Sequence, residues 1–398
     1  MRELWPLLLT NALCMACMTS FIAVAGPLVR ELGLAEWHGG LIITLAGVCW
    51  MLLSRAWGRA SDARGRKPVL LTGIGGFAIA YLLLGAAIDL ALTRRPGVLI
   101  ALTMLALLRG LIGSFYAAIP PASAALIADR TGPERRAQGM AVLGAANGVG
   151  IILGPLMGGL LAVYGLDVPM YAAAMLPLLA LFVLWRTLPA EAAPGGTDAP
   201  AVRLTDPRLR LPLAIMLLVV SCVNVAQLCV GFFVLDRLGL NAAQGARMAG
   251  LTMAGVGVAL IGVQAVMSRM PGVSLHFWLS GGALLAAAGF AGVTLVWDSW
   301  GLVVSYAVCA AGLGVVFPAC QALAANSVTA TEQGVAAGTL SAAQGVAMVA
   351  APLAGTALYG IFPELPYIMA AAALVLMSGI ARLRTPRAEA ARQAAIRR

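Results

Sequence analysis

Long apolar runs alternate with short polar segments along this chain, and the pattern predicts membrane-spanning helices. A helix needs about 20 mainly apolar residues to cross a bilayer, and hydrocarbon accepts only helices or closed barrels because unpaired backbone groups are costly there. No strand-like alternation is present, and the first run is too long for a cleavable signal peptide. We predict twelve spans, at about 4–29, 39–57, 68–90, 97–127, 137–164, 168–186, 209–235, 246–268, 274–296, 300–325, 334–361 and 365–383.

Composition supports an all-α integral membrane protein. Of 398 residues, 61% are hydrophobic and 11% are charged, whereas soluble domains average about 25% charged residues. The seven cysteines lie inside the apolar runs, with neither metal-ligand spacing nor an extracellular disulfide pattern. We expect them to fill the core, and we expect no metal site.

The placement of Lys and Arg predicts the orientation in the membrane, because cytoplasmic segments carry an excess of both. With the N-terminus inside, the inner segments hold twenty of these residues and the outer loops hold five. We therefore expect both termini in the cytoplasm, and we attribute the net charge of +10 to topology rather than to nucleic-acid binding. Tryptophans near the span ends are expected to form only an aromatic belt at the membrane surface: Trp5, Trp37, Trp57, Trp185, Trp297 and Trp300.

An internal repeat divides the chain into related halves. PASAALIAD at 121–129 returns as PACQALAAN at 318–326, 197 residues later, and the same offset maps GAANG at 144–148 onto SAAQG at 341–345. A segment rich in Pro, Ala, Gly and Asp between the halves is typical of a flexible linker. We predict a six-helix bundle at 1–187, a cytoplasmic linker at 188–208, a second six-helix bundle at 209–384 and a basic cytoplasmic tail at 385–398.

Three motifs stand at defined places in this pattern. The segment between the second and third runs has the spacing G-x-x-x-D-x-x-G-R-K, formed by Gly58, Asp62, Gly65, Arg66 and Lys67. The fourth run contains the pair Arg109 and Gly113. The fifth contains a motif of glycines and a proline, in which Gly150, Gly154 and Gly158 share one helix face: Gly150, Gly154, Pro155, Gly158 and Gly159.

In these motifs the chain resembles the major facilitator superfamily, and within it the twelve-helix drug–proton antiporter group. Asp129 and Arg136 match the usual cytoplasmic loop after the fourth helix, so the resemblance covers essentially the whole chain. It implies a monomeric secondary transporter in a bacterial-type inner membrane, driven by a proton gradient and without a cofactor. It also implies that the fifth-run motif belongs to an exporter.

Two arrangements are possible for Asp62. It can pair with Arg66 or Lys67, or it can accept hydrogen bonds from the N-terminus of a helix in the other half. The resemblance favours the second arrangement, a conformational latch on the cytoplasmic side that also includes Gly58, Gly65, Asp129 and Arg136. Gly58 is expected to let a neighbouring helix approach closely. The alternative is that the basic residues only set topology.

Arg109 lies well inside a span, where a charge is costly unless it finds a partner. It is either part of a structural pair or a functional group that binds an anionic part of the cargo or modulates a proton site.

The glycine stripe is predicted to pack closely against a neighbouring helix, as is Gly148, and to slide against the other half during transport. The chain departs from many drug–proton antiporters because no Asp or Glu lies at mid-depth in a predicted span, so coupling is left to Asp62, Asp129, Asp236 or the cargo itself.

Few other polar residues occur in the spans. Singly they are typical of hydrogen bonds between helices, and together they are candidates for a weakly polar substrate pocket: Asn11, Asn147, Asn224, Gln227, Gln321 and Gln344.

The sequence thus predicts a secondary active exporter of a small molecule that works by alternating access. The cargo is either drug-like or an anionic or zwitterionic metabolite, and a siderophore-like metallophore is an alternative. An enzyme is disfavoured because the chain has two histidines, His38 and His276, and no catalytic or nucleotide-binding motif. A non-transporting membrane sensor or scaffold is the alternative from another class.

Overall fold

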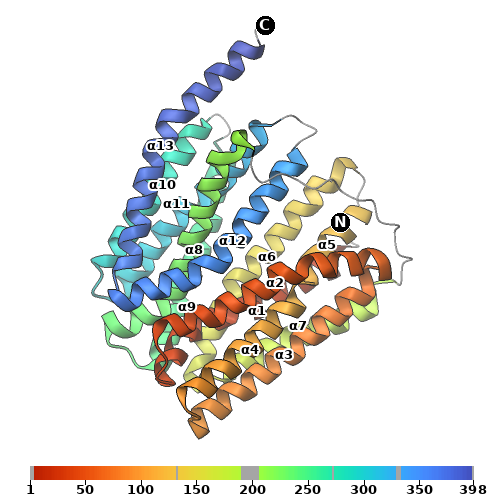
Figure 1. Ribbon diagram of the computed structural model, residues 1–398, viewed down its shortest axis with the longest axis vertical. Coiled ribbons are helices and arrows are strands. Elements are labelled where there is room, and N and C mark those ends of the chain that lie inside the picture. Colours follow the sequence, from red (N-terminus) through yellow and green to blue (C-terminus); the bar gives the residue numbers. More distant parts are fainter. Residues whose placement is uncertain (1–3, 131–132, 190–205, 271–272, 329–332, 397–398) are drawn as a thin grey trace. The chain divides into compact units, whose positions relative to one another are not determined.

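The computed structural model describes residues 4–130, 133–189, 206–270, 273–328 and 333–396 (Figure 1). These residues form α-helices and two short 3-10 helices at Ala162–Tyr164 and Pro207–Leu209. The α-helices are α1 (Trp5–Glu31), α2 (Glu36–Arg64), α3 (Arg66–Arg94), α4 (Val98–Tyr116), α5 (Ile119–Arg130), α6 (Pro133–Leu161), α7 (Val168–Thr187), α8 (Arg210–Leu238), α9 (Ala242–Ser268), α10 (Leu275–Thr294), α11 (Ser299–Asn326), α12 (Gln333–Ile361) and α13 (Leu365–Ile396).

Twelve candidate membrane spans lie within the described residues, which confirms the predicted all-α membrane fold. The chain forms two compact units. Unit 1 consists of Met1–Ala199, Leu228–Ala254 and Pro352–Ala357, and unit 2 consists of Pro200–Gln227, Gly255–Ala351 and Leu358–Arg398. The domain boundaries drawn from the sequence stay predictions.

The fourth predicted span is not one helix but two, α4 and α5, separated at Ala117 and Ala118. The cause is the pair Pro120 and Pro121, which have no backbone N–H and cannot bond to the carbonyl groups one turn earlier. Both prolines are accommodated in the first turn of α5, where an N–H has no partner inside the helix. Under the 197-residue offset, only one of them has a proline counterpart, Pro318, and α11 runs unbroken through it.

Gly65 makes the turn between α2 and α3. Its φ of 92° is a conformation that glycine adopts without strain, whereas a Cβ makes it unfavourable. Its N–H bonds to the carbonyl oxygen of Ser61 at 3.1 Å, which ends α2. The turn therefore places the side chains of the first motif at the junction of two helices.

The glycine stripe of α6 packs against α1 within unit 1. A Cβ at Gly150 would meet the backbone of Ala12, one at Gly154 would meet Ala16 and Thr19, and one at Gly158 would meet Ser20. Thr19 Oγ1 also donates to the Gly150 carbonyl oxygen at 3.1 Å. The partner of these three glycines is thus a helix of the same unit, which is different from the predicted sliding contact with the other half.

Two further glycines of the motifs also stand at close contacts in unit 1. Gly113 of α4 lies against the backbone of Ala46 in α2, and Gly159 lies against the backbone of Gly250 in α9. The carbonyl oxygen of Pro155 also approaches Gly250. These contacts agree with helix packing as the role of small residues in membrane bundles.

Gly58 and Gly148 differ from this pattern. A Cβ at either position would have no atom within 4 Å among the described residues. The expectation of a close helix contact at these two glycines is therefore not met, because neither faces a neighbouring helix closely enough to need the missing side chain.

This contrast allows a test with one chemical change at two sites of α6. Alanine gains about 0.8–1 kcal/mol over glycine in a helix, so Gly148→Ala should raise the thermal unfolding temperature of the purified protein slightly. Gly154→Ala should lower it by several degrees, because the new methyl group overlaps Thr19 and the Ala16 carbonyl group and overpacking costs about 1–3 kcal/mol. Equal effects of both substitutions on unfolding in detergent would contradict the packing described here.

Candidate functional site

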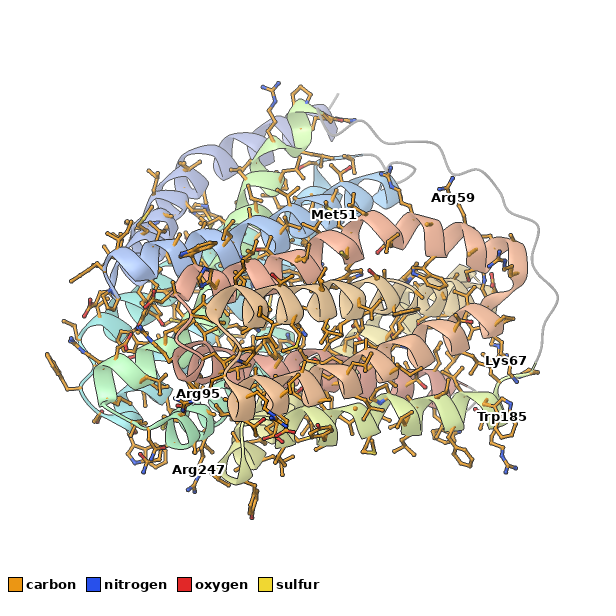
Figure 2. The ribbon with its side chains drawn as sticks, turned by 60° about the horizontal axis from the view of Figure 1, so that its bottom comes forward. Met51, Arg59, Lys67, Arg95, Trp185 and Arg247 are labelled. Atoms are coloured by element: carbon orange, nitrogen blue, oxygen red, sulfur yellow. The ribbon has the colours of Figure 1, made fainter. Side chains whose placement is uncertain are left out.

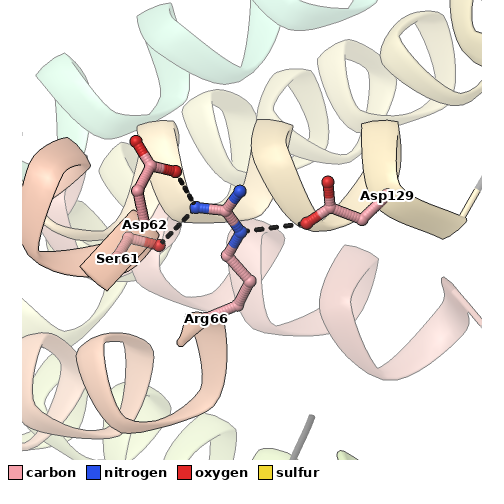
Figure 3. A network of polar contacts seen from close by, with 4 residues as sticks. All are labelled: Ser61, Asp62, Arg66 and Asp129. Carbon is pink, nitrogen blue, oxygen red and sulfur yellow. Dashed lines mark hydrogen bonds and ion pairs between the residues drawn. The ribbon is translucent and has the colours of Figure 1, made fainter. Parts of the chain in front are cut away.

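Arg66 is the centre of a polar cluster that joins α2, α3 and α5 in unit 1 (Figure 3). Its Nη1 bonds to Asp62 Oδ1 and to Ser61 Oγ at 3.2 Å, and its Nε bonds to Asp129 Oδ2 at 2.9 Å. The Arg66 side chain is 10% exposed, whereas Asp62 is 47% exposed. One cation is thus shared by two carboxylates, and the three side chains together carry a charge of about −1.

This geometry places four predicted latch residues. Of the partners considered for Asp62, Arg66 is the one present within unit 1, and Asp129 belongs to the same cluster. Gly65 positions the turn. The side chain of Arg136 lies outside the described residues, and the latch function of the group stays a prediction.

Lys67 has a separate role from Arg66. Its Nζ donates to the carbonyl oxygen of Trp185 at 3.1 Å and to that of Leu188. These carbonyl groups lie at the C-terminal end of α7, where the helix dipole favours a cation. Figure 2 shows Lys67 and Trp185 together at this end of α7. The lysine therefore holds the start of α3 against the end of α7.

Trp57 makes a specific contact that sequence reasoning missed by assigning it to the aromatic belt. Because the Ala118 N–H bonds to Phe115 at the break after α4, the Ser114 carbonyl group loses its usual donor. Trp57 Nε1 supplies one at 2.8 Å. The two prolines were only an indirect signal, because the carbonyl groups that they leave without a helical donor are those of Tyr116 and Ala117, whereas the Ser114 carbonyl group is freed by the break itself.

Arg109 lies on α4 and is 3% exposed. Its Nη1 donates to the hydroxyl oxygen of Tyr81 at 3.3 Å, and its guanidinium carbon lies 4.6 Å from the centre of the Phe21 ring. The Tyr81 hydroxyl in turn donates to the carbonyl oxygen of Met18 at 3.2 Å. α1 and α3 thus provide the immediate surroundings of this charge.

The electrostatic balance at Arg109 is incomplete. An arginine at the centre of a membrane helix costs about 2.5–3.5 kcal/mol on insertion scales, and a desolvated cation–π contact returns about 2 kcal/mol or more of this cost. The structure gives it no ion pair with a carboxylate of the described residues, and its Nε is buried without a hydrogen-bond partner. An unsatisfied buried donor costs about 1–3 kcal/mol, so the site has capacity for an anionic partner.

The repeat provides an internal comparison. Under the 197-residue offset, Arg109 corresponds to Tyr306 on α11. The Tyr306 hydroxyl is fully bonded in unit 2, to Tyr367 Oη at 2.8 Å and to the Ala226 carbonyl oxygen at 3.0 Å. A neutral, satisfied side chain therefore fills this position in one unit. The fold does not require a charge there.

The other polar candidates fall into different environments. In unit 1, Asn11 bonds to Ser123 Oγ at 2.9 Å and joins α1 to α5, which matches a hydrogen bond between helices. Asn147 Oδ1 is buried without a partner among the described residues. In unit 2, Asn224 bonds to the Val220 carbonyl oxygen in its own helix, and Gln227 is half-buried on the same helix.

Gln321 and Gln344 are brought together in unit 2, where both line a pocket of about 380 Å³ between α11 and α12.

Asp236, a candidate for proton coupling, accepts a hydrogen bond from Arg30 Nη2 at 2.7 Å in unit 1, and Arg30 also pairs with Glu36 at 2.8 Å. None of these placements tests a role in transport, so the roles stay predictions.

Comparisons with known proteins identify the family. The family model of the Major Facilitator Superfamily matches residues 7–298 and 275–398. Tetracycline resistance protein, class G, of Vibrio anguillarum is 31% identical over 84% of this chain and 85% of its own length. Tetracycline resistance protein, class C, of Escherichia coli is 28% identical over 81% and 80%.

Solved structures show the same fold. The nucleoside transporter NupG covers 96% of this chain and 99% of its own with a TM-score of 0.76 at 11% identity. The human organic anion transporter MFSD10 covers 96% and 99% with a TM-score of 0.65 at 20% identity. The twelve spans and the matched family model define a membrane transporter. The chain belongs to the Major Facilitator Superfamily, and it is a multi-pass inner-membrane transporter of small molecules rather than an enzyme.

The shared guanidinium of Arg66 predicts non-additive effects on stability. Asp62→Asn or Asp129→Asn alone should lower the thermal unfolding temperature slightly, because the remaining carboxylate still pairs with Arg66 and exposed ion pairs contribute about 0–1 kcal/mol. The double substitution should cost more than the sum, since it leaves a largely buried cation without an anion. Asp89→Asn, at the other end of α3, is the charge-matched control for unfolding in detergent, and a purely additive double variant would contradict the shared pairing.

Proposed function

We propose that the protein is a secondary active exporter of drug-like or anionic and zwitterionic small molecules, driven by a proton gradient. Two relatives with coverage of most of the chain are tetracycline resistance proteins. A membrane transporter gives resistance most simply by moving a compound out of the cell, and the glycine and proline motif of α6 agrees with export by its resemblance to exporters.

The observation that carries the proposed cargo class is the environment of Arg109. The guanidinium has an aromatic face and one hydroxyl group as partners, and Nε is left without one. Guanidinium groups bind carboxylates and similar acidic oxygens in a bidentate way. An anionic group of the cargo is the partner that this site lacks.

Arg109 is covered in the conformation described here, so the cargo reaches it only after a neighbouring side chain moves. We take the Phe21 ring to be the group that moves, because it lies over the guanidinium at 4.6 Å and makes no hydrogen bond to it. Opening and closing of this contact is therefore coupled to cargo binding. Alternating access requires such a difference between states.

We propose that protons couple through carboxylates at the ends of the spans or through titratable groups of the cargo itself. Asp62 and Asp129 share Arg66, and Asp236 pairs with Arg30. Protonation of an acid in such a cluster weakens its bond to the arginine and so changes the balance between conformations. We further propose that both termini lie in the cytoplasm, that the protein acts as a monomer, and that Asp62, Arg66 and Asp129 form part of a cytoplasmic latch.

The roles of Arg109 are tested by accumulation of two probes in everted membrane vesicles under a proton gradient. Tetracycline carries acidic oxygens, and ethidium is a cation without them. Arg109→Ala should reduce tetracycline accumulation about tenfold or more, because a bond to a charged group contributes about 1.5–3 kcal/mol. Arg109→Lys should keep part of the activity, because it keeps the charge and loses the bidentate geometry.

Arg59→Ala is the control, since Arg59 is an exposed arginine of the same unit. Wild-type protein should not accumulate ethidium. If the wild type and Arg109→Ala both accumulate ethidium and also accumulate tetracycline equally, the anionic cargo class is wrong and a general multidrug exporter remains.

The latch is tested by Asp62→Asn in the same vesicles. Asp62 is half exposed, so its bond is worth about 1 kcal/mol, and its loss should shift a two-state equilibrium about fivefold. We expect reduced tetracycline transport at normal expression, together with faster labelling of a cysteine introduced on the cytoplasmic side. Unchanged transport and unchanged labelling would remove Asp62 from the latch.

A further inference from the structure

One face of α7 in unit 1 is exposed along most of its length. Large apolar side chains follow one another on it at intervals of three or four residues, the spacing of neighbours on one helix face: Tyr171, Met175, Leu179, Phe182 and Trp185. α7 is one of the candidate membrane spans. In a bilayer this apolar stripe of α7 contacts lipid chains, because those chains are as apolar as the side chains themselves.

Arg186 stands at the end of the apolar stripe. Its side chain is exposed, and its guanidinium carbon lies 5.3 Å from the ring centre of Trp185 and 5.4 Å from that of Phe182. Both distances are within the limit of about 6 Å for a cation–π contact. The two rings therefore hold a positive charge where the apolar stripe ends.

Arg186 has no acidic partner among the residues that the structure describes. Asp62 and Asp129, the acids beside the start of α3, are paired with Arg66 instead. A guanidinium group presents a fork of N–H donors that matches the oxygens of a carboxylate or a phosphate. The exposed charge of Arg186 is thus available to an anion from outside the protein.

Lys67 provides a second positive charge next to Arg186. Its Nζ donates to the carbonyl oxygen of Trp185 at 3.1 Å, one residue before Arg186, and to that of Leu188 (Figure 2). An ammonium group has three N–H donors, so one remains for a ligand. The lysine also offsets the negative end of the α7 dipole, which would otherwise repel an anion at this place.

Other exposed arginines of unit 1 lack this arrangement. Arg55, Arg59 and Arg64 of α2 have no contact with an aromatic ring among the described residues. The general excess of positive charge that sets membrane topology is enough to explain them. It does not explain a guanidinium that is held by two rings of an exposed apolar stripe.

We propose that Arg186, supported by Phe182 and Trp185, binds the phosphate group of an anionic phospholipid, with Lys67 as the second cation. The acyl chains of this lipid lie along the apolar stripe of α7. A lipid fits better than a soluble anion because the positive charge and the apolar surface are continuous on one helix face. The site belongs to unit 1 alone, and it depends neither on the cargo nor on the direction of transport.

The site is tested by native mass spectrometry of the purified full chain in detergent, titrated with phosphatidylglycerol or phosphatidylcholine of identical acyl chains. The wild type should bind the anionic phosphatidylglycerol more tightly. Arg186→Ala should weaken phosphatidylglycerol binding about fivefold, the equivalent of about 1 kcal/mol for one basic residue at a membrane surface, and leave phosphatidylcholine binding unchanged. Phe182→Leu keeps the charge and an apolar side chain but removes one ring, so it should weaken phosphatidylglycerol binding about twofold to fivefold.

Arg59→Ala is the matched control, because Arg59 is an exposed arginine of the same unit without a ring contact, and it should keep the wild-type affinity for phosphatidylglycerol. Thermal unfolding shows whether each variant folds, and Arg186→Gln replaces Arg186→Ala if that variant does not. Equal weakening by Arg59→Ala and Arg186→Ala would overturn the site and leave only a general attraction to basic surface. Equal affinities of the wild type for the two lipids would also overturn it.

Glycerol phosphate distinguishes a lipid site from a site for a soluble anion, because it carries the phosphate group without the chains. Phosphatidylglycerol should raise the thermal unfolding temperature of the wild type, since a ligand of the folded state stabilises that state, and it should raise that of Arg186→Ala less. Glycerol phosphate at the same concentration should have no such effect. An equal rise with both compounds would overturn the assignment to a lipid.

Discussion

A bilayer offers no water to the backbone, so each N–H and C=O group in hydrocarbon has to find its partner inside the protein. Long helices satisfy this constraint locally, and most of the chain consists of them. The informative place is the break between α4 and α5 next to Pro120 and Pro121, where the Ala118 N–H bonds to Phe115 and leaves the Ser114 carbonyl group without its usual donor. There the Ser114 carbonyl group is bonded by the indole of Trp57 from α2. A side chain from a neighbouring helix thus supplies the hydrogen bond that the backbone of the broken helix does not provide.

The need for a partner inside the protein is stronger still for a charged side chain in hydrocarbon. Arg66 is at the end of a span and has two carboxylates and a serine around it. Arg109 is within a span and has an aromatic ring and a tyrosine hydroxyl. Since its counterpart in the repeat is a satisfied tyrosine, the arginine adds a cost that the fold does not demand. Costs of this kind in membrane proteins usually mark functional sites.

Much of the fold was predictable from the sequence, because span length and hydropathy are set by bilayer thickness. The twelve spans and the resemblance carried by Asp62 and the glycine motif both agreed with the family assignment. Pairing between helices was less predictable. The spacing of Gly150, Gly154 and Gly158 predicts a close contact with another helix but does not identify that helix. In the structure the partner is α1.

The site was predictable in its types of residue and less so in their surroundings. Arg109 stood out as a charge in an apolar run, whereas Phe21 and Tyr81 are ordinary aromatic residues in a sequence and became visible only through their distances to it. Open positions such as Gly58 were misjudged because a motif glycine looks the same whether or not a helix faces it.

The most direct test of the central claim is an experimental structure of the protein with tetracycline bound. The account predicts an acidic oxygen of the ligand within about 3 Å of the Arg109 guanidinium, with the Phe21 ring displaced from its position over that group. A ligand bound elsewhere, with Arg109 still covered by Phe21 and bonded to Tyr81, would contradict it.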